Sequence, residues 1–301
     1  MTVDVEDYFQ VEALASVVSP SDWSAWPARV ETNTNRILEL FSASGTRATF
    51  FTLGWVAERF PALVRRIVSA GHELASHGLS HVRADRQSRE VFLADSRRAR
   101  LMLEDIGGAP VKGYRAASFS ITGTNLWAFE VLQEAGYCYS SSTNPIRHDL
   151  YGIPDQPRSA FRPLPDSQFL EIPVSTARRF GANWPSGGGG YFRLLPYRLF
   201  KANLEHALRN DGGPLNFYFH PWEIDPDQPR IPGLGFKSAT RHYLNLSRTY
   251  GRLTRLLRDF VWRRVDEVYP VNEPADAVDP PSAAPIVAPA VRRAGRALAE
   301  S

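Results

Sequence analysis

The sequence predicts an α/β protein whose parallel strands are joined by crossover helices, in a sheet that is closed as a barrel or left open. Short strand-like segments alternate with longer segments of helical periodicity along most of the chain. The chain has 301 residues, of which 43% are hydrophobic and 22% are charged. A chain of this length and composition can bury a large core, as one α/β domain or as two smaller ones.

The first elements follow one another closely. A strand is predicted at "TVDV", residues 2–5, and a helix at residues 35–45, where Gly45 is placed to end it. The aromatic and β-branched run "RATFFTLG", residues 47–54, predicts the next strand. Pro61 opens a further predicted helix, at a favoured position for proline, and the strand-like "HELASHG" comes next.

The later elements continue this alternation until a long insertion. A polar helix is predicted near residues 87–106, and further strands at "KGYRA", "YCYSS", "FLEIPVS" and "LNFYFH". Residues 143–195 are rich in Pro and Gly and contain "GGGG" at 187–190. No Gly-Lys-Ser/Thr follows these glycines, which excludes a phosphate-binding loop. Long insertions of this kind are often lids or binding loops, so we expect a mobile loop here.

The composition changes at Val271, after which Ala, Pro and scattered charges dominate. We therefore expect a folded catalytic domain at residues 1–270 and a disordered tail at residues 271–301. The chain has 35 Lys and Arg against 32 Asp and Glu, a net charge of +3 that is too small to indicate nucleic-acid binding. The single cysteine, Cys138, excludes an internal disulfide and a cysteine-rich zinc site.

No segment approaches the roughly 18 apolar residues of a membrane span. The N-terminus also lacks a basic region followed by an apolar run, which is the pattern of a signal peptide. As written, the chain is therefore expected to have no membrane span and to be cytoplasmic. Because the first strand begins at residue 2, upstream residues remain an alternative.

Three carboxylates lie at the exit of the first predicted strand in "TVDVEDYFQ": Asp4, Glu6 and Asp7. Crowded like charges repel and lose hydration, so they require partners unless they form a solvated loop. His77 and His81 in "SHGLSH" are candidate partners, because a spacing of four places both imidazoles on one face of a helical turn. Such pairs suit zinc and related ions. The preceding strand-like "GHELAS" places them where a parallel sheet presents its active edge.

Two histidines and one carboxylate form a three-ligand site with positions left for water, which is the pattern of catalytic metal sites. A second carboxylate can then act as general base on that water. Arg115, in "GYRAASFS", is a candidate for the cation that keeps this base ionised, with a surface salt bridge as the alternative. His220 closes the apolar run "LNFYFH" and is a candidate general acid, with a core histidine as the alternative.

In this order the pieces resemble the polysaccharide deacetylase family (the NodB-homology domain, carbohydrate esterase family 4) over about residues 1–270. More narrowly, "VDVEDYF", "ASHGLSH", "FHPWEID" and "QPRIPG" resemble the branch associated with exopolysaccharide loci and exosortase systems. The resemblance implies a distorted (β/α) barrel and one divalent metal ion, usually zinc. It also implies an N-acetylated glycan as substrate, from which the enzyme removes acetyl groups.

The resemblance also implies individual roles. The base falls on Asp4, the metal histidines on His77 and His81, the arginine that orients the base on Arg115, and the leaving-group acid on His220. The metal carboxylate stays open between two residues, because the usual pair of adjacent aspartates is absent and Val5 follows Asp4. Strand alternation places Glu6 on the same face as Asp4, whereas Asp7 is the alternative if the strand has already ended.

Three positions depart from the family pattern. Gly78 stands where Ser or Thr is usual, and Ala117 where proline is usual. The acid that often supports the catalytic histidine would fall near Ser140, and Glu223 or Asp225 could replace it. A backbone N–H from "YSSS" is expected to hold the oxyanion.

Aromatic residues are candidates for stacking on sugar rings, with core packing as the alternative; these are Trp184, Tyr191 and Trp222. The competing functions are hydrolysis of a small cyclic amide, as in allantoinase, and carbohydrate binding by a fold that has lost its chemistry.

Overall fold

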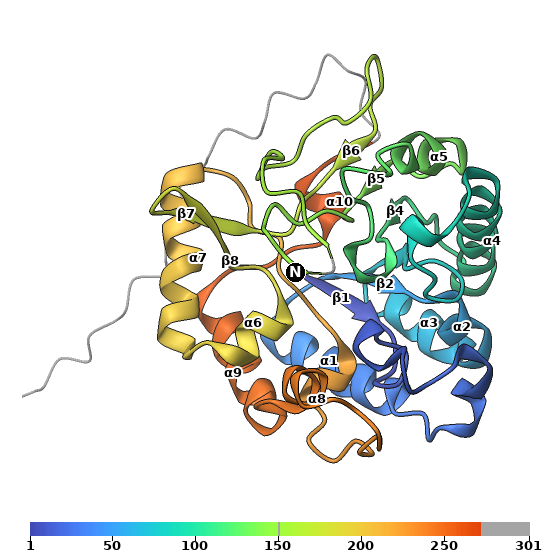
Figure 1. Cartoon of the computed structure of the whole chain (residues 1–301), viewed down its shortest axis with the longest axis horizontal. Helices are drawn as coiled ribbons and strands as arrows, with labels where there is room; N and C mark the ends of the chain where they lie inside the picture. The colour runs from blue at the N-terminus through green and yellow to red at the C-terminus, as the bar shows by residue number, and fades with distance from the viewer. Residues whose placement is uncertain (150, 272–301) are drawn as a thin grey trace, which may run out of the picture.

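The computed structural model describes residues 1–149 and 151–271, and its centre is one parallel sheet. Its strands lie in the order β6-β5-β4-β3-β2-β1-β9, and each neighbouring pair is parallel. They are β1 (Thr2–Val5), β2 (Thr49–Thr52), β3 (Glu73–Ser76), β4 (Gly113–Tyr114), β5 (Tyr139–Ser140), β6 (Leu170–Glu171) and β9 (Tyr218–Phe219). The sheet curls into a half-barrel with the helices around its outside (Figure 1). This is the predicted α/β class with a distorted barrel.

The helices follow the predicted order. In the described residues they are α1 (Val30–Ser44), α2 (Gly54–Arg59), α3 (Pro61–Ser69), α4 (Arg89–Gly107), α5 (Ala128–Glu134), α6 (Gly189–Leu194), α7 (Tyr197–Asp211), α8 (Phe236–Tyr243), α9 (Leu246–Asp259) and α10 (Val265–Val268). Gly45 ends α1 in the left-handed conformation with φ of 64°, as predicted. Pro61 is the first residue of α3, and Ser88 caps α4 by accepting a hydrogen bond from the Val91 N–H.

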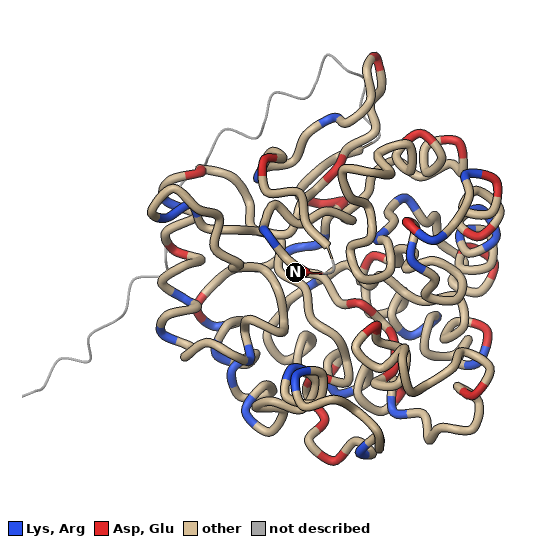
Figure 2. Tube along the Cα trace, in the orientation of Figure 1, with Lys and Arg blue, Asp and Glu red and all other residues tan. Residues whose placement is uncertain are grey.

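Strand β1 shows how the sheet positions the site. Its side chains alternate, so Val3 and Val5 pack in the main hydrophobic core. Thr2 and Asp4 point to the other face, where both contact Arg115. Acidic positions follow β1 near the centre of the molecule, whereas most other charges lie on the outer helices and loops (Figure 2).

The insertion at 143–195 is more ordered than predicted. It contains β6, a hairpin of β7 (Thr176–Arg179) and β8 (Ala182–Pro185), and helix α6. Gly187, Gly188 and Gly189 are buried against neighbouring segments. A Cβ at Gly187 would lie 2.4 Å from the Asn216 carbonyl oxygen, which explains why a side chain is excluded there. The prediction of a mobile loop is therefore wrong for these glycines, because close packing gives them a fixed place.

The predicted tail at 271–301 lies outside the described residues apart from Val271. Among the helices of residues 1–149 and 151–271, none combines the length and the apolar character that crossing a membrane requires.

Candidate active site

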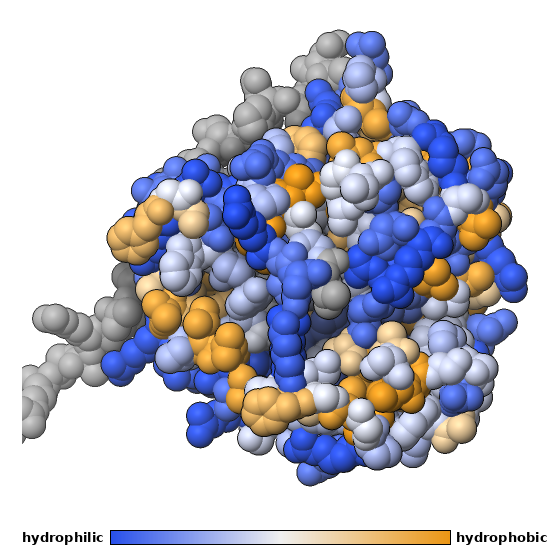
Figure 3. Space-filling view, viewed as in Figure 1, coloured by the Kyte–Doolittle hydropathy of each residue, from blue (hydrophilic) through white to orange (hydrophobic). Residues whose placement is uncertain are grey.

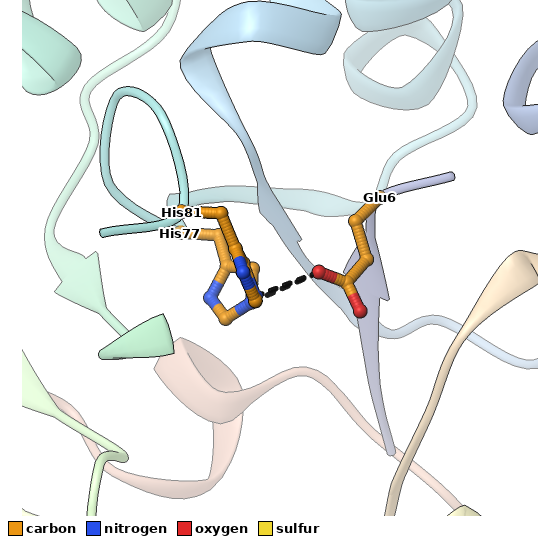
Figure 4. Close-up of side chains that lie close together, drawn as sticks. All are labelled: Glu6, His77 and His81. Atoms are coloured by element: carbon orange, nitrogen blue, oxygen red, sulfur yellow. Dashed lines mark ion pairs between the residues drawn. The ribbon is translucent and has the colours of Figure 1, made fainter. Parts of the chain in front are cut away.

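Three candidate metal ligands meet at one edge of the sheet. Glu6 directly follows β1, His77 directly follows β3, and His81 lies four residues further on. One ligand atom of each lies within 4.8 Å of the others (Figure 4). The His81 Nε2 atom is 2.7 Å from Glu6 Oε2, and His77 Nε2 is 4.0 Å from the same oxygen. Only β2 separates β1 from β3, so adjacent strand ends bring the three residues together.

The two histidines are brought together by a loop, and the predicted helical turn is wrong. Residues 77–82 are not helical, and both Gly78 (φ of 78°) and His81 (φ of 56°) adopt the left-handed conformation. The carbonyl groups of Gly78 and Leu79 accept hydrogen bonds from the first N–H groups of α2. These bonds attach the loop to the N-terminus of α2. The left-handed backbone also explains why glycine stands at position 78.

The chemistry of these side chains fits a divalent cation. The Nδ1 atom of His77 donates to the carbonyl oxygen of Arg115 at 2.9 Å, because a carbonyl can only accept; this leaves the Nε2 lone pair free for a metal. Burial lowers the pKa of His77 to about 4, so its ring is neutral at pH 7. Glu6 Oε2 is buried and receives no hydrogen bond from the described residues. An orphaned buried carboxylate oxygen beside two imidazoles suits a metal ion.

Asp7 occupies a different place. Its Oδ2 atom accepts hydrogen bonds from the N–H groups of Arg29 and Val30, at 2.7 and 3.0 Å, where α1 begins. Its Oδ1 atom accepts from the Tyr8 N–H at 2.9 Å. A carboxylate at a helix N-terminus satisfies free N–H groups and opposes the helix dipole. The structure therefore does not bring Asp7 to the histidines, and Glu6 is the remaining candidate of the two.

Asp4 and Arg115 form a buried ion pair rather than a surface salt bridge. Arg115 is 0% exposed and Asp4 is 1% exposed, and Arg115 Nη1 donates to Asp4 Oδ1. The guanidinium also donates to the Ser141 carbonyl oxygen at 2.9 Å and to Ser141 Oγ at 2.8 Å. It lies 4.1 Å from the ring centre of Phe51. These contacts fix the guanidinium, which in turn orients the Asp4 carboxylate.

His220 lies across the site from the histidine pair. Its Nε2 atom is 3.4 Å from Glu6 Oε1 and 3.9 Å from Asp4 Oδ2. Its Nδ1 atom contacts Glu223 Oε1 at 2.7 Å. Burial alone would lower the pKa of His220, but the hydrogen bond to Glu223 and the nearby carboxylates raise it to about 9. His220 is therefore protonated at pH 7, as a general acid must be.

Glu223 is thus the acid beside His220, while Asp225 binds Arg29 and Asn33 elsewhere. The sequence carried a signal for this choice. In "HPWE", the histidine is followed by a proline at the first helical position and a glutamate at the third. This pattern is typical of a capping box, in which the glutamate side chain accepts from the backbone N–H of the residue before the helix. The Glu223 carboxylate does accept from the His220 backbone N–H, at 3.1 Å.

One cavity of about 150 Å³ joins these groups. Figure 3 shows hydrophilic side chains around the hollow near the centre of this face. The cavity is lined by Asp4, Glu6, Val11, Glu12, His77, His81, Ser118, Phe119, Tyr151, Tyr218, His220 and Trp222. Trp184 and Tyr191 are absent from this lining, whereas Phe119, Tyr151 and Tyr218 line it without having been predicted.

Trp222 lines the cavity and is 5% exposed. Its ring stacks with His220, at 5.2 Å and 22°, and with His242, at 4.3 Å and 14°. These two contacts take up much of the ring, and stacking of Trp222 on a sugar stays a prediction. The buried Nε1 atom of this ring receives no partner among the described residues.

The expected oxyanion donor in "YSSS" is also corrected. The N–H of Ser141 donates to the Tyr114 carbonyl oxygen, and that of Ser142 donates to Glu171. These groups are already committed to the fold. Ser118 lines the cavity instead, and Ser118 and Phe119 both have positive φ, of 53° and 51°. Non-glycine residues held in this conformation are concentrated at functional sites.

Comparison with known proteins finds similarity in two consecutive parts of the chain. Residues 22–139 match the family model described as polysaccharide deacetylase. This part of the chain, which is less than half of it, is similar to polysaccharide deacetylases. Residues 141–270 match a second family model, described as a domain of unknown function (DUF3473). The first match includes His77, His81 and Arg115, while His220 and Glu223 lie within the second.

Part of the chain is also similar to curated deacetylases. The chain is 31% identical over 129 residues to a peptidoglycan deacetylase of Helicobacter pylori, covering 41% of each chain. It is 36% identical over 59 residues to a peptidoglycan-N-acetylglucosamine deacetylase of Bacillus cereus, covering 20% of this chain and 28% of that one. It is 40% identical over 48 residues to a chitooligosaccharide deacetylase of Sinorhizobium fredii, covering 16% and 22%. The chain thus spans less than half the length of each of these relatives.

Solved structures show the same fold. A structure from Mycobacterium smegmatis assigned as a polysaccharide deacetylase has a TM-score of 0.57 at 20% identity, covering 89% of this chain and 87% of that one. The Puue allantoinase structure has a TM-score of 0.51 at 20% identity, covering 88% and 86%. Because two differently named proteins share it, the fold alone does not choose between their reactions.

Proposed function

We propose that this protein is a metal-dependent hydrolase that removes N-acetyl groups from the amino sugars of a polysaccharide, and that zinc is its metal. The observation that carries the proposal is the lining of one cavity by two sets of residues. It holds the ligand set Glu6, His77 and His81, and it also holds Asp4 and His220 as proton-transfer groups. Amide hydrolysis by a metal needs both sets together. The deacetylase relatives supply the substrate class.

Asp4 is the general base in this proposal. Arg115 and its bonds to Ser141 hold the Asp4 carboxylate in one orientation, so the free oxygen faces the cavity and can take a proton from water. Glu6, His77 and His81 would hold the zinc ion, which when bound supplies Lewis acidity to a carbonyl and lowers the pKa of a water molecule.

His220 is the general acid. Its Nδ1–H is held by Glu223, so the proton on Nε2 is the one that faces Asp4, Glu6 and the cavity. This proton passes to the departing sugar nitrogen as the amide bond breaks, because an amine must be protonated to leave. We place the oxyanion beside Ser118 and Phe119, which line the cavity.

The test is acetate release from purified protein with chitooligosaccharides, peptidoglycan and N-acetylated exopolysaccharides, each with and without a chelator. We expect release that the chelator abolishes and added zinc restores. Hydrolysis of allantoin without acetate release from any glycan would establish the cyclic-amide alternative. Glycan binding without turnover, by protein that takes up no metal, would establish the binding alternative. Preferential turnover of exopolysaccharide would support the narrower branch that the sequence motifs indicate.

A further inference from the structure

The glycine run of residues 187–190 packs against Glu223, the partner of the candidate acid His220. A Cβ placed on Gly189 would lie 2.2 Å from Glu223 Oε1 and 2.6 Å from Oε2, closer than nonbonded atoms can approach. A Cβ placed on Gly190 would meet nothing within 4 Å. Both glycines are in α6 and neither has a positive φ. The backbone at Gly189 therefore does not require glycine; the space taken by the Glu223 carboxylate does.

The Glu223 carboxylate is held on both of its oxygens. Oε1 accepts from His220 Nδ1 at 2.7 Å and from the His220 N–H at 3.1 Å, so one oxygen binds both the ring and the backbone of the same residue. Oε2 accepts from Arg193 Nε at 2.6 Å. Glu223 is 1% exposed and Arg193 is 3% exposed. Each charge is therefore compensated inside the protein, as buried charges must be.

Arg193 is itself anchored to the end of another helix. Its Nη1 atom donates to the carbonyl oxygens of His242 and Leu244, both at 2.9 Å. Its Nη2 atom donates to the Arg241 carbonyl oxygen at 3.0 Å. These carbonyl groups lie at the C-terminus of α8, where they have no partner within the helix and where a positive charge is favoured. The guanidinium thus has a fixed position from which to direct the carboxylate.

We propose that Gly189 and Arg193 are positioning residues that act through Glu223 to orient the His220 ring for proton transfer. Arg193 fixes the carboxylate, Gly189 leaves the space that it fills, and the carboxylate holds Nδ1–H. A carboxylate is only an acceptor, so this bond keeps a proton on Nδ1 and directs Nε2 to the cavity. The glycine-rich segment "GGGGYFR" is then part of the acid's support. The role of His220 as an acid rests on the proposed function. The position of its ring, held by Glu223, does not depend on that function.

The test compares Gly189→Ala with the matched control Gly190→Ala on two substrates. One is an N-acetylglucosamine oligomer, whose amine needs an acid to leave; the other is an activated aryl acetate, whose phenolate does not. We expect Gly189→Ala to lose about 10–100-fold in kcat on the oligomer, the usual cost of disturbing a supporting contact, and to stay within a few-fold on the aryl acetate. Gly190→Ala should match the parent chain on both. Metal content should not change in either variant.

A second variant covers the case in which Gly189→Ala does not fold. Arg193→Lys keeps the positive charge but cannot serve Glu223 and three carbonyl groups at once, so it should show the same selective loss. Equal activity of Gly189→Ala and Gly190→Ala on the oligomer would overturn the proposal. So would an equal loss on both substrates in a folded, metal-loaded variant, because that pattern indicates a general structural role.

Nitrogen NMR of the imidazole rings separates this inference from the proposed function. The parent chain should show His220 with its proton on Nδ1 and a strong hydrogen bond to that proton, and Gly189→Ala should lose this signature while Gly190→Ala keeps it. If the signature behaves in this way but no glycan is deacetylated, the positioning device stands and the proposed function fails. If the parent chain lacks the signature, the positioning device is wrong whatever the activity.

Discussion

The two halves of the candidate site are built in different ways. The metal half uses residues that directly follow strands of the central sheet: Glu6 after β1, His77 after β3 and Arg115 after β4. The acid half, at His220, depends on α6, on the 3-10 helix Pro221–Ile224 and on the end of α8. Strand ends determine where the first half lies, and hydrogen bonds with α2 and Ser141 support it. The second half is held mainly by side chains from distant segments. The boundary between the two matching family models, near residue 140, falls between the halves.

This contrast predicts different consequences of mutation. A change in the metal half should remove a function common to every substrate, because the metal acts on the carbonyl and the water. A change in the acid half should affect only substrates whose leaving group needs a proton.

The largest effect is expected from His77→Ala. It removes one of three protein ligands, so the variant should lose most of its bound metal and about 10³-fold or more in activity on both amide and ester substrates, given several kcal/mol of Lewis-acid stabilisation. Elemental analysis and acetate release measure the two effects. His206→Ala is the control, because His206 lies in α7, outside the cavity lining. A full equivalent of metal in His77→Ala would remove the site from the mechanism.

The next effect separates the two proton transfers. Asp4→Asn should keep the metal and lose roughly 10²–10⁴-fold on both an N-acetylglucosamine oligomer and an aryl acetate, the usual contribution of a general base. His220→Ala should lose a similar factor on the oligomer and little on the aryl acetate. Steady-state kinetics with both substrates measures the difference. If His220→Ala is equally impaired on both, His220 is not the leaving-group acid, and the contrast between the halves is wrong.

A smaller effect distinguishes the two acids that the sequence left open. Glu6→Gln should lose metal, whereas Asp7→Asn should keep it and lose about 1–2 kcal/mol in the free energy of unfolding, the cost of weakening a helix cap. Metal analysis and urea denaturation of both variants decide this. Metal loss in Asp7→Asn at unchanged stability would reverse the assignment.

Sequence reasoning could identify the metal half because its signals are local. Strand patterns and the spacing of His77 and His81 lie within a few residues of the atoms that they place. The choice between Glu6 and Asp7 was not local. It depends on a tight turn after β1, where the Glu6 N–H donates to the Asp4 carbonyl oxygen, and on N–H groups of α1 more than twenty residues away.

The acid half was predicted less well for the same reason. His220 is recognisable at the end of an apolar strand, and the capping-box pattern marks Glu223. Neither shows that His242 stacks on Trp222, or that Arg193 anchors the carboxylate. These contacts join segments 20 to 50 residues apart, and only the packed structure determines which of several candidates meet.

The smallest effect concerns a buried carboxylate that lies away from the cavity and belongs to neither half. Glu73, at the start of β3, accepts hydrogen bonds from Thr49 Oγ1 at 2.5 Å, from Tyr139 OH at 2.8 Å and from the Asp266 N–H at 3.2 Å. Burial, together with the charge of Asp266, raises the pKa of Glu73 to about 7. The folded state therefore prefers the protonated form, while the unfolded chain ionises near pH 4.5.

Stability from this group should accordingly be lost as the pH rises through the window from about 4.5 to about 7, because the unfolded state releases its proton first. Glu73→Gln mimics the protonated form and removes the dependence. The free energy of unfolding of this variant minus that of the parent chain should be about 1–3 kcal/mol larger at pH 8 than at pH 5. Urea denaturation at both pH values measures this difference, and the exposed Glu130→Gln serves as control. Activity should not change, since Glu73 lies outside the cavity lining. An identical difference at the two pH values would show that Glu73 is already ionised at pH 5 in the folded protein, which would contradict the raised pKa.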